Sequence, residues 1–483
     1  AGGTYEIVGA SINGHLALAY TTAANTRMHT WDGSTVRRSG LAASVAPTAA
    51  NGGGAGVATL RYYRERSTRQ SGGITIGRSE SSASVSFTPG ANGVTVTQAA
   101  VINEGETHWE VEASIDNVTF YRIATVVIGT TTYLDNANPT SYNLSPLSAA
   151  AGIYTLQKAY KFIAADQNRL LGFGSWLATD KQSRIEVSAV IGSLDIADEE
   201  RVDTTINYFI DLDEGDSGAA TGLAGPVLGS FFAFKLRQVA QLTATGQTSQ
   251  PYSVKFLSKV IGSVSHRSIS VGEDQDGNPA IYWMSLRGPY RWGSRGLEYI
   301  GKGIEDLVSG PTSYMYSNTV FIYLVKTIYY GDKKQVWFWF YTTAGSYVLT
   351  IFHVLSGGWS RYTGDVAQAG AAVMFSETVG ATMSTALKPY VSYITANAPH
   401  IIKYDSGNSD PVNAAFQASV TTKVYEPGGP GFYGQVGDAL LLAAPSPGLQ
   451  LSIRATVTPD FGVATTKTAI VDLTASGAET RVI

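Results

Sequence analysis

The fold is decided by the stretch KKQVWFWFYTTAGSYVLTIFHVLSGGWSRYTG, residues 333–364. Side chains alternate between the two faces of a strand, so Val336 and Phe338 share one face. Trp337 and Trp339 then share the other. Both faces of this predicted strand are therefore apolar, and each needs a partner that removes it from water.

Three strands are predicted in this stretch, Val336–Tyr341, Tyr347–Leu355 and Trp359–Thr363, joined by turns that contain glycine. Such short turns predict an antiparallel meander, because a parallel pair needs a crossover of about a dozen residues. Antiparallel sheets commonly leave one face to water, so two apolar faces call for a neighbour on each side. A β-propeller supplies those neighbours by radial repetition of small sheets. The alternative is the central strands of an ordinary two-sheet sandwich.

Composition predicts a folded, turn-rich β protein of two to four structural units. The chain has 483 residues, 44% of them hydrophobic, with 52 Gly and 27 Tyr. Glycine suits tight turns, and tyrosine suits strands. Charged residues make up only 15%, well below the usual quarter. This low fraction indicates either a surface covered by other subunits or the Ser-, Thr-, Asn- and Gly-rich surface of extracellular proteins.

Charge and cysteine content exclude several classes of protein. The formal charge of −4 and the pI near 5.9 argue against binding of nucleic acid through clustered Lys and Arg, although a channel through which DNA slides stays possible. With no Cys there is no disulfide, thiolate metal site or cysteine nucleophile. No apolar run reaches the ~18 residues that span a bilayer. The chain begins at Ala1 without Met or a leader, so its start was processed or lies inside a longer chain.

Residues 1–45 are predicted to form the first propeller blade. Turn residues separate four short strands, and an Asp-Gly turn joins the last two. These strands are Tyr5–Val8, His15–Tyr20, Arg27–Trp31 and Val36–Leu41. The stretch from Val45 to about Gly56 is rich in Ala, Asn and Gly, which predicts a linker.

Residues 46–145 are predicted to form an inserted β-sandwich. On the strand after His108, Trp109 and Val111 share one face while Glu110 and Glu112 share the other, which is typical of a half-buried strand. The densest basic cluster, residues 61–69, could bind phosphate. Its interleaved glutamate and the strand alternation favour a solvated sandwich face instead.

Residues 146–415 are predicted to hold the main blades, and residues 416–483 a C-terminal β extension or closing strands. Strands are expected within Tyr160–Ala164, Arg169–Gly174, Arg184–Ser188, Ser230–Arg237, Val239–Leu242, Ala280–Ser285 and Tyr390–Ala396. One short helix is predicted within residues 194–208, and helix is expected to be scarce elsewhere. The irregular spacing of these groups is compatible with roughly five to seven blades.

Two acidic loops, Asp211–Gly218 and Glu273–Asn278, resemble calcium loops, because a hard cation needs several oxygen ligands within one turn. Neither loop has the full ligand spacing, and hairpin turns use Asp, Asn and Gly in any case. We therefore predict no metal site and keep only weak candidate ligands: Asp211, Asp213, Asp274, Asp276 and Asn278. The six His residues form no pair at metal-binding spacing, and His353 is expected to be a hydrogen-bonded core or interface residue.

No motif predicts catalysis or a cofactor. The chain lacks Gly-x-Ser-x-Gly and the Gly-x-x-x-x-Gly-Lys-Ser/Thr phosphate loop, and no local motif singles out a pair of carboxylates. The aromatic run 337–341 could be a sugar platform if it were exposed, but core burial is favoured. We therefore expect a protein that is not an enzyme.

Two resemblances follow from these segments. The Tyr-rich strand, the Ser79–Ser81 segment and the final TTTYLD, which contains Tyr133 and Asp135, resemble the fibronectin type III-like or Ig-like insert of phage tail proteins. The order of WDGSTVRRSGL, DLDEGDSGAATGL, SLRGPYRWGSRGLEYIGKGIEDL and QVWFWFYTTAGSYVLT resembles the β-propeller proteins of short-tailed, podovirus-type phage tails. These are the nozzle, tail tubular B-like and packaged-DNA-stabilisation proteins. The resemblance implies an all-β fold, a β-propeller with an inserted fibronectin III/Ig-like β-sandwich.

The same resemblance implies a structural protein of the phage virion. Several copies, typically six, would form a homo-oligomeric ring below the portal and adaptor, next to tail fibres or spikes, and DNA would pass through the lumen without specific binding. We expect a neutral to acidic inner wall, since a basic wall would bind phosphate. The alternative is a tail or extracellular adhesin that binds glycan, and a glycan-degrading propeller is a third possibility. No cofactor and no membrane span are expected.

Overall fold

The structure, a computed structural model, is an all-β protein built from many small antiparallel sheets. It describes residues 7–20, 27–166, 168–177, 179–190, 201–308, 321–341, 347–362, 372–379, 382–395, 398–403, 439–441, 450–457, 465–472 and 480–482. Within these ranges helix is confined to short turns, of which α1 (Glu305–Val308) is the one α-helical segment. None of these helices has the length and apolarity needed to cross a bilayer. The chain splits into two compact units, residues 1–414 and 415–483.

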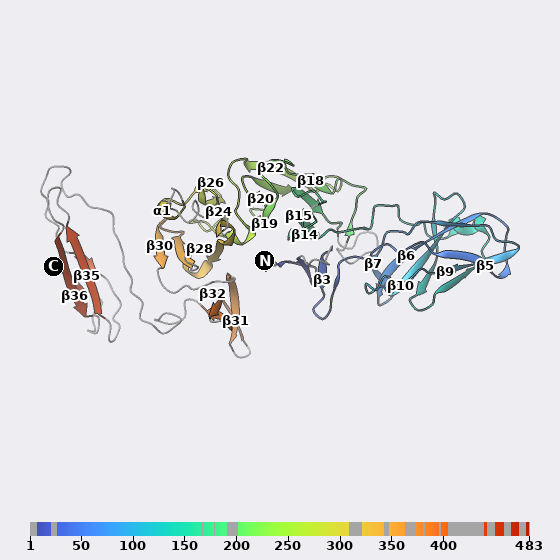
Figure 1. Ribbon diagram of the computed structural model, residues 1–483, viewed down its shortest axis with the longest axis horizontal. Helices are drawn as coiled ribbons and strands as arrows, with labels where there is room; N and C mark the ends of the chain where they lie inside the picture. The colour runs from blue at the N-terminus through green and yellow to red at the C-terminus, as the bar shows by residue number, and fades with distance from the viewer. Residues whose placement is uncertain are drawn as a thin grey trace. The chain divides into compact units, whose positions relative to one another are not determined.

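Six small sheets follow one another along the first unit, each an antiparallel meander in chain order (Figure 1). The first has β1 (Val8–Ile12), β2 (His15–Ala19), β3 (His29–Trp31) and β4 (Val36–Arg38). The second has β14 (Tyr160–Asp166), β15 (Arg169–Ser175), β16 (Arg184–Val187) and β18 (Phe209–Asp211). The third has β19 (Ala220–Val227), β20 (Ser230–Lys235), β21 (Val239–Ala244) and β22 (Tyr252–Ser258).

The last three sheets complete the series. The fourth has β23 (Ile269–Glu273), β24 (Pro279–Ser285), β25 (Gly288–Gly293) and β26 (Gly296–Tyr299). The fifth has β27 (Lys326–Tyr330), β28 (Gln335–Tyr341), β29 (Tyr347–His353) and β30 (Trp359–Tyr362). The sixth has β31 (Ala372–Val379), β32 (Thr382–Thr395) and β33 (Ala398–Lys403). The first strand of each sheet contacts the first strand of the next, from β1 through β14, β19, β23 and β27 to β31.

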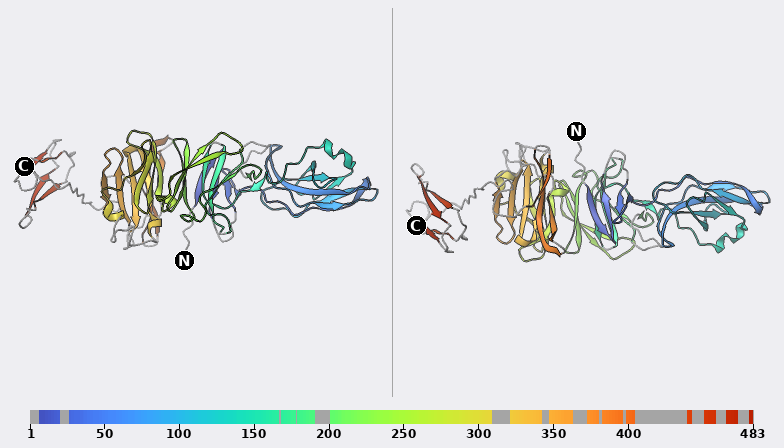
Figure 2. Two further views of the ribbon diagram at one scale, coloured as in Figure 1. Left: turned by 90° about the horizontal axis from the view of Figure 1, so that it is seen from above. Right: turned by 90° about the horizontal axis from the view of Figure 1, so that it is seen from below.

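The fifth sheet confirms the predicted meander and its burial on both faces. Phe338 of β28 packs in one core with β24 of the fourth sheet, and both Phe338 and Trp339 have no exposed surface. Trp339 packs in a different core, together with Val391 of the sixth sheet. The fourth sheet repeats the pattern, because Trp283 faces the third sheet and Tyr282 faces the fifth. Each interior sheet therefore shares its two faces with two neighbours, and Figure 2 shows the sheets lying side by side.

Small residues allow the first strands to approach one another closely. A Cβ at Gly222 of β19 would lie 2.3 Å from Ile269 of β23. A Cβ at Gly272 of β23 would lie 2.3 Å from the ring of Tyr329 of β27. Glycine in these strands therefore marks close packing between sheets rather than a turn.

A two-sheet unit lies between the first and second sheets in sequence. One sheet has the order β11 (Tyr121–Val127), β10 (His108–Ser114), β6 (Arg61–Ser71) and β7 (Ile74–Arg78), with β8 (Val85–Phe87) also paired to β6. The other has the order β12 (Thr132–Asp135), β9 (Asn92–Thr97) and β5 (Thr48–Ala55). Trp109 and Val111 of β10 pack against Val94 and Val96 of β9 in their shared core.

One prediction of local structure was wrong, and two others lie partly outside the described residues. The expected linker from Val45 to Gly56 contains β5, because its glycines let the strand lie against β9 and β12. A Cβ at Gly52 would be only 2.5 Å from Leu134. Of the strand predicted for Tyr5–Val8, residues 5–6 lie outside the described residues, and the described strand runs from Val8 to Ile12. Of the helix predicted within 194–208, residues 194–200 lie outside the described residues, and the described remainder, 201–208, contains the strand β17 (Arg201–Val202).

The second unit is described in part. Its strands pair as β35 (Gln450–Val457) with β36 (Thr465–Asp472), and as β34 (Ala439–Leu441) with β37 (Thr480–Val482). The strands predicted at Gln450–Val457 and near Thr466–Leu473 are confirmed as an antiparallel pair.

Candidate functional site

A dense group of charged side chains lies on strands β6 and β10. These strands pair antiparallel, with Arg64 opposite Glu112 and Arg66 opposite Glu110. All four side chains point to the same face of the sheet, as strand alternation predicts. The predicted solvated face, however, is wrong. Arg66 is 0% exposed, Glu110 2% and Glu112 1%.

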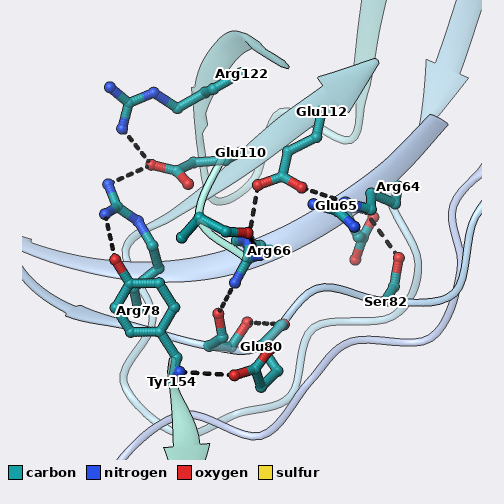
Figure 3. Close-up of polar contacts among 12 residues, drawn as sticks. Arg64, Glu65, Arg66, Arg78, Glu80, Ser82, Glu110, Glu112, Arg122 and Tyr154 are labelled. Atoms are coloured by element: carbon teal, nitrogen blue, oxygen red, sulfur yellow. Dashed lines mark hydrogen bonds and ion pairs between the residues drawn. The ribbon is translucent and has the colours of Figure 1, made fainter. Parts of the chain in front are cut away.

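The charges on this face pair with one another (Figure 3). Glu112 accepts from Arg66 Nε at 2.6 Å and also from Arg64. Glu110 Oε1 accepts from Arg78 and from Arg122, each at 2.9 Å. We call Arg64, Arg66, Arg78, Arg122, Glu110 and Glu112 the arginine–carboxylate network. Hydrogen bonds from charged donors to charged acceptors are about twice as strong as neutral ones, which compensates part of the cost of burying the charges.

Two backbone carbonyls accept hydrogen bonds from the terminal nitrogens of the Arg66 guanidinium. Arg66 donates to the carbonyl oxygen of Ser79 at 2.9 Å and to that of Ala149 at 2.8 Å. The segments that carry these carbonyls therefore cover the face that the sequence left open to water. This is why β10 is buried on both sides and is not the half-buried strand predicted from its alternation.

Tyr154 is the aromatic centre of this covered face. Its ring centroid lies 5.5 Å from the guanidinium carbon of Arg66, 5.7 Å from that of Arg78 and 5.4 Å from that of Arg201. Its hydroxyl accepts from Arg78 at 3.2 Å. Its backbone N–H donates to Glu80 at 2.6 Å. The negative face of an aromatic ring attracts cations, so one tyrosine holds guanidiniums from three strands.

The opposite face of β6 carries a second buried polar group. Arg61 pairs with Asp135 at 3.1 Å, and both side chains are fully buried. Tyr63 donates its hydroxyl to the same carboxylate at 2.7 Å, and Tyr142 does so as well. Burial, with the negative charge of Asp135 nearby, raises the pKa of Tyr63. Asp135 therefore ties β12 and the turn after it to β6 of the facing sheet.

Glu65 is the exception to this pairing. It lies on the same face of β6 as Tyr63 and has no exposed surface. One carboxylate oxygen accepts from the backbone N–H of Ala99 at 3.1 Å, and the other has no hydrogen-bond partner. Burial raises the pKa of the Glu65 carboxyl.

The weak metal candidates are used in turns and ion pairs. Asp211 forms a two-point pair with Arg184, at 2.7 and 2.9 Å, and Asp213 pairs with Lys259 at 2.6 Å. Asp274 accepts from the backbone N–H groups of Asp276 and Asn278, which closes the turn between β23 and β24. Asp276 pairs with Arg295 at 2.9 Å. Within the described ranges, no three His, Cys, Asp or Glu side chains gather as a metal site would require.

His353 lies at the end of β29 and is hydrogen-bonded within the protein. Its Nε2 lies 2.9 Å from the hydroxyl of Ser360 on the neighbouring strand β30. Residues 337–340 of the aromatic run are buried, with Trp337 5% exposed and Trp339 fully covered, so these four rings offer no sugar platform. The side chain of Tyr341 lies outside the described residues.

The arrangement is suited to holding strands in place. Each carboxylate of the arginine–carboxylate network already accepts from two guanidiniums, and none of these groups is left as a base or nucleophile. Sequence reasoning missed Arg78, Arg122, Glu80 and Tyr154 as members of this site. The available signal was the pair Glu110 and Glu112 on one predicted strand next to a strand rich in Arg, which predicts cross-strand ion pairs once the two are aligned.

Comparisons with known proteins add little. No protein-family model matches the chain, and no curated protein does. Among solved structures, one named as a 6-phosphogluconolactonase of Bacteroides uniformis is 11% identical, covers 74% of this chain and 94% of its own, and has a TM-score of 0.33. A lectin of Aleuria aurantia bound to α-methyl-L-fucoside is 9% identical, covers 76% and 97%, and has a TM-score of 0.24. At such TM-scores these likenesses carry no argument about fold or function.

Proposed function

We propose that this chain is a structural protein of a phage virion, a ring-forming nozzle or head-to-tail component that lines part of the DNA ejection channel. The proposal rests on the resemblance of its ordered segments to the propeller proteins of short-tailed phage tails. The observation that carries it is the use of side chains. The aromatic residues 337–340 of β28 are buried between sheets, and the arginine–carboxylate network pairs internally, as suits a protein built for rigidity.

In this proposal the six small sheets are blades of a β-propeller, and the two-sheet unit is a fibronectin III/Ig-like insert. Outward-facing apolar residues remain on the two end sheets. Trp31 is 40% exposed on the first, and Phe375 is 57% exposed on the sixth. Contact between these two end sheets would close the propeller within one chain and remove the outer faces of both sheets from water. We expect Phe375→Ala to lower the free energy of unfolding by about 2 kcal/mol or more if they meet, and by under about 0.5 kcal/mol if they do not.

The proposed partners are further copies of the chain, which would form a hexameric ring. This ring would contact adaptor and portal-side tail proteins and tail fibres or spikes. DNA would pass through without specific binding, in keeping with the charge of −4. Negative-stain electron microscopy of the purified full chain tests this. We expect ring particles with an axial hole, and a solution mass of one chain at all concentrations would contradict the proposal.

One observation favours a glycan-binding adhesin as the second candidate. Within the described residues four large aromatic side chains are exposed: Trp31 at 40%, Tyr299 at 38%, Tyr323 at 48% and Phe375 at 57%. Exposed aromatic faces can stack on sugars, as binding sites lined by such residues do. Binding of the monomer to a glycan array, lost on Trp31→Ala, would favour this candidate over the nozzle.

A further inference from the structure

Two segments connect the two-sheet unit to the small sheets on either side of it in sequence. Residues 39–47 lead from β4 into β5, and residues 148–159 lead towards β14. An inserted unit joined by two such segments can swing unless each segment is fixed by contacts of its own. In this chain each is fixed by buried polar groups.

Glu104 holds the first connection. Its carboxylate, with a side chain only 6% exposed, lies 2.7 Å from Arg27 and 3.5 Å from Arg38, which belong to the first small sheet and its approach. It also accepts from the backbone N–H of Ala42 at 2.9 Å. The backbone carbonyl of Glu104 accepts from Arg69 of β6 at 3.0 Å. Glu104 therefore joins the first small sheet, the connection and the two-sheet unit at one point.

Tyr154 holds the second connection. The residue lies on that segment, is 2% exposed and is contacted by Arg66 and Arg78 of the two-sheet unit. Arg201 of β17 contacts the same ring and donates to the backbone carbonyl of Ile153 at 2.9 Å. Next to Tyr154, β13 (Thr155–Leu156) pairs with β17. The ring is thus held by the two-sheet unit on one side and on the other by β17, which lies between β16 and β18 of the second small sheet in sequence.

We infer that Glu104 and Tyr154 form a two-point clamp that fixes the two-sheet unit to the small sheets beside it, so that it is a rigid arm and not a tethered module. Either point of the clamp alone would still allow the two-sheet unit to rotate about that point. The second point, on the other connection, prevents this rotation, because the contacts at both points would have to break before the two-sheet unit could turn. This inference holds for a single chain and for a ring alike, so it stands or falls independently of the proposed function.

The test measures the distance between the two regions. The chain contains no Cys, so Ser86→Cys on β8 and Ser253→Cys on β22, both exposed, place one spin label in each region. Double electron–electron resonance then gives the distribution of distances in the full chain. We expect a single narrow peak without further substitution. Glu104→Gln and Tyr154→Leu should each broaden it, and the two together should abolish the narrow peak.

The controls separate release of the clamp from loss of the fold. Arg295→Ala removes an exposed ion pair, in which the side chain of Arg295 is 57% exposed and that of Asp276 is 50% exposed. This variant should leave the peak in the distance distribution unchanged. Hydrogen exchange in β6 and β10 shows whether the two-sheet unit stays folded in each variant. A broad distribution without substitutions at Glu104 or Tyr154 would overturn the inference. An unchanged narrow peak in the doubly substituted clamp, with β6 and β10 still protected, would overturn it as well. If Tyr154→Leu unfolds the unit, Tyr154→Phe with Glu104→Gln provides the milder comparison.

Discussion

Replacing Glu112 by leucine should be among the most damaging single substitutions in the two-sheet unit. Glu112 is 1% exposed and accepts from Arg66, which is 0% exposed, and from Arg64, whose side chain is 16% exposed. Without Glu112, the buried Arg66 keeps its two carbonyl partners and the ring of Tyr154 but loses the carboxylate that pairs with it. Arg64 is near enough to the surface to regain water.

The expected magnitude follows from this geometry. Removing one partner of a buried ion pair costs about 3–5 kcal/mol, because the other charge stays buried without compensation. Only one of the two arginines is stranded, so we expect about 3–4 kcal/mol, the lower part of that range. In contrast, Arg295→Ala at an exposed pair should cost about 0–1 kcal/mol.

Hydrogen exchange of the full chain, followed by mass spectrometry on peptides that cover β6 and β10, measures this local stability. The expected loss corresponds to roughly 100- to 1,000-fold faster exchange, since about 1.4 kcal/mol is tenfold. The variant that carries Glu112→Leu and Arg66→Met together should recover most of the loss, because an apolar pair of similar volume leaves no stranded charge. Exchange within tenfold of the unsubstituted chain in the single variant would refute the reasoning, as would equal damage in the single and double variants.

Three further predictions concern single positions. Burial raises the pKa of the Glu65 carboxyl in the folded chain, so the chain should lose stability as pH rises from the ordinary pKa of 4.5 through the raised pKa. Glu65→Gln should remove this loss. The calorimetric Tm of this variant should therefore rise relative to that of the unsubstituted chain between pH 4 and pH 8. Equal pH profiles would contradict it. Phe338→Ala should cost about 3–5 kcal/mol in denaturant unfolding, whereas Leu355→Ala, at a side chain 68% exposed, should cost under about 0.5 kcal/mol. Gly152→Ala should lower the free energy of unfolding more than Gly73→Ala in the same assay. Both glycines have positive φ, but of the two only a Cβ at Gly152 would meet a neighbouring atom, a threonine hydroxyl at 2.3 Å. Equal losses would show that backbone conformation alone sets the cost of the two substitutions.

Alternation along β28 was enough to predict where its side chains go. Both faces of that strand are apolar over several residues, and a strand of this kind has no stable arrangement with one face in water. The sequence also indicated short meanders, because turn residues recur between the apolar runs. Which sheets touch, and through which faces, depends on contacts between distant segments and could not be predicted from local pattern.

The charged face of β6 shows where local pattern fails. Alternation correctly put Arg64 and Arg66 on one face, but it carries no information on what covers that face. The cover comes from Ser79 and from the segment around Tyr154, which is about ninety residues away from Arg66 along the chain. Likewise, the glycines near Gly52 have the composition of a linker, and only the closeness of Leu134 shows that they serve a strand.

Sharing of faces between successive sheets also governs how the first unit should come apart. Trp283 and Tyr282 belong to one strand yet contribute to two separate cores. Deletion of one interior sheet would therefore expose one apolar face on each of its two neighbours. In such a chain, contacts between adjacent sheets contribute more to the free energy of unfolding than contacts within one sheet. If the first and sixth sheets do not meet, loss of structure should start at these end sheets and advance inward, and a truncated chain should melt earlier as more junctions between sheets are removed. If they do meet, the first unit has no end sheet and should unfold as a whole.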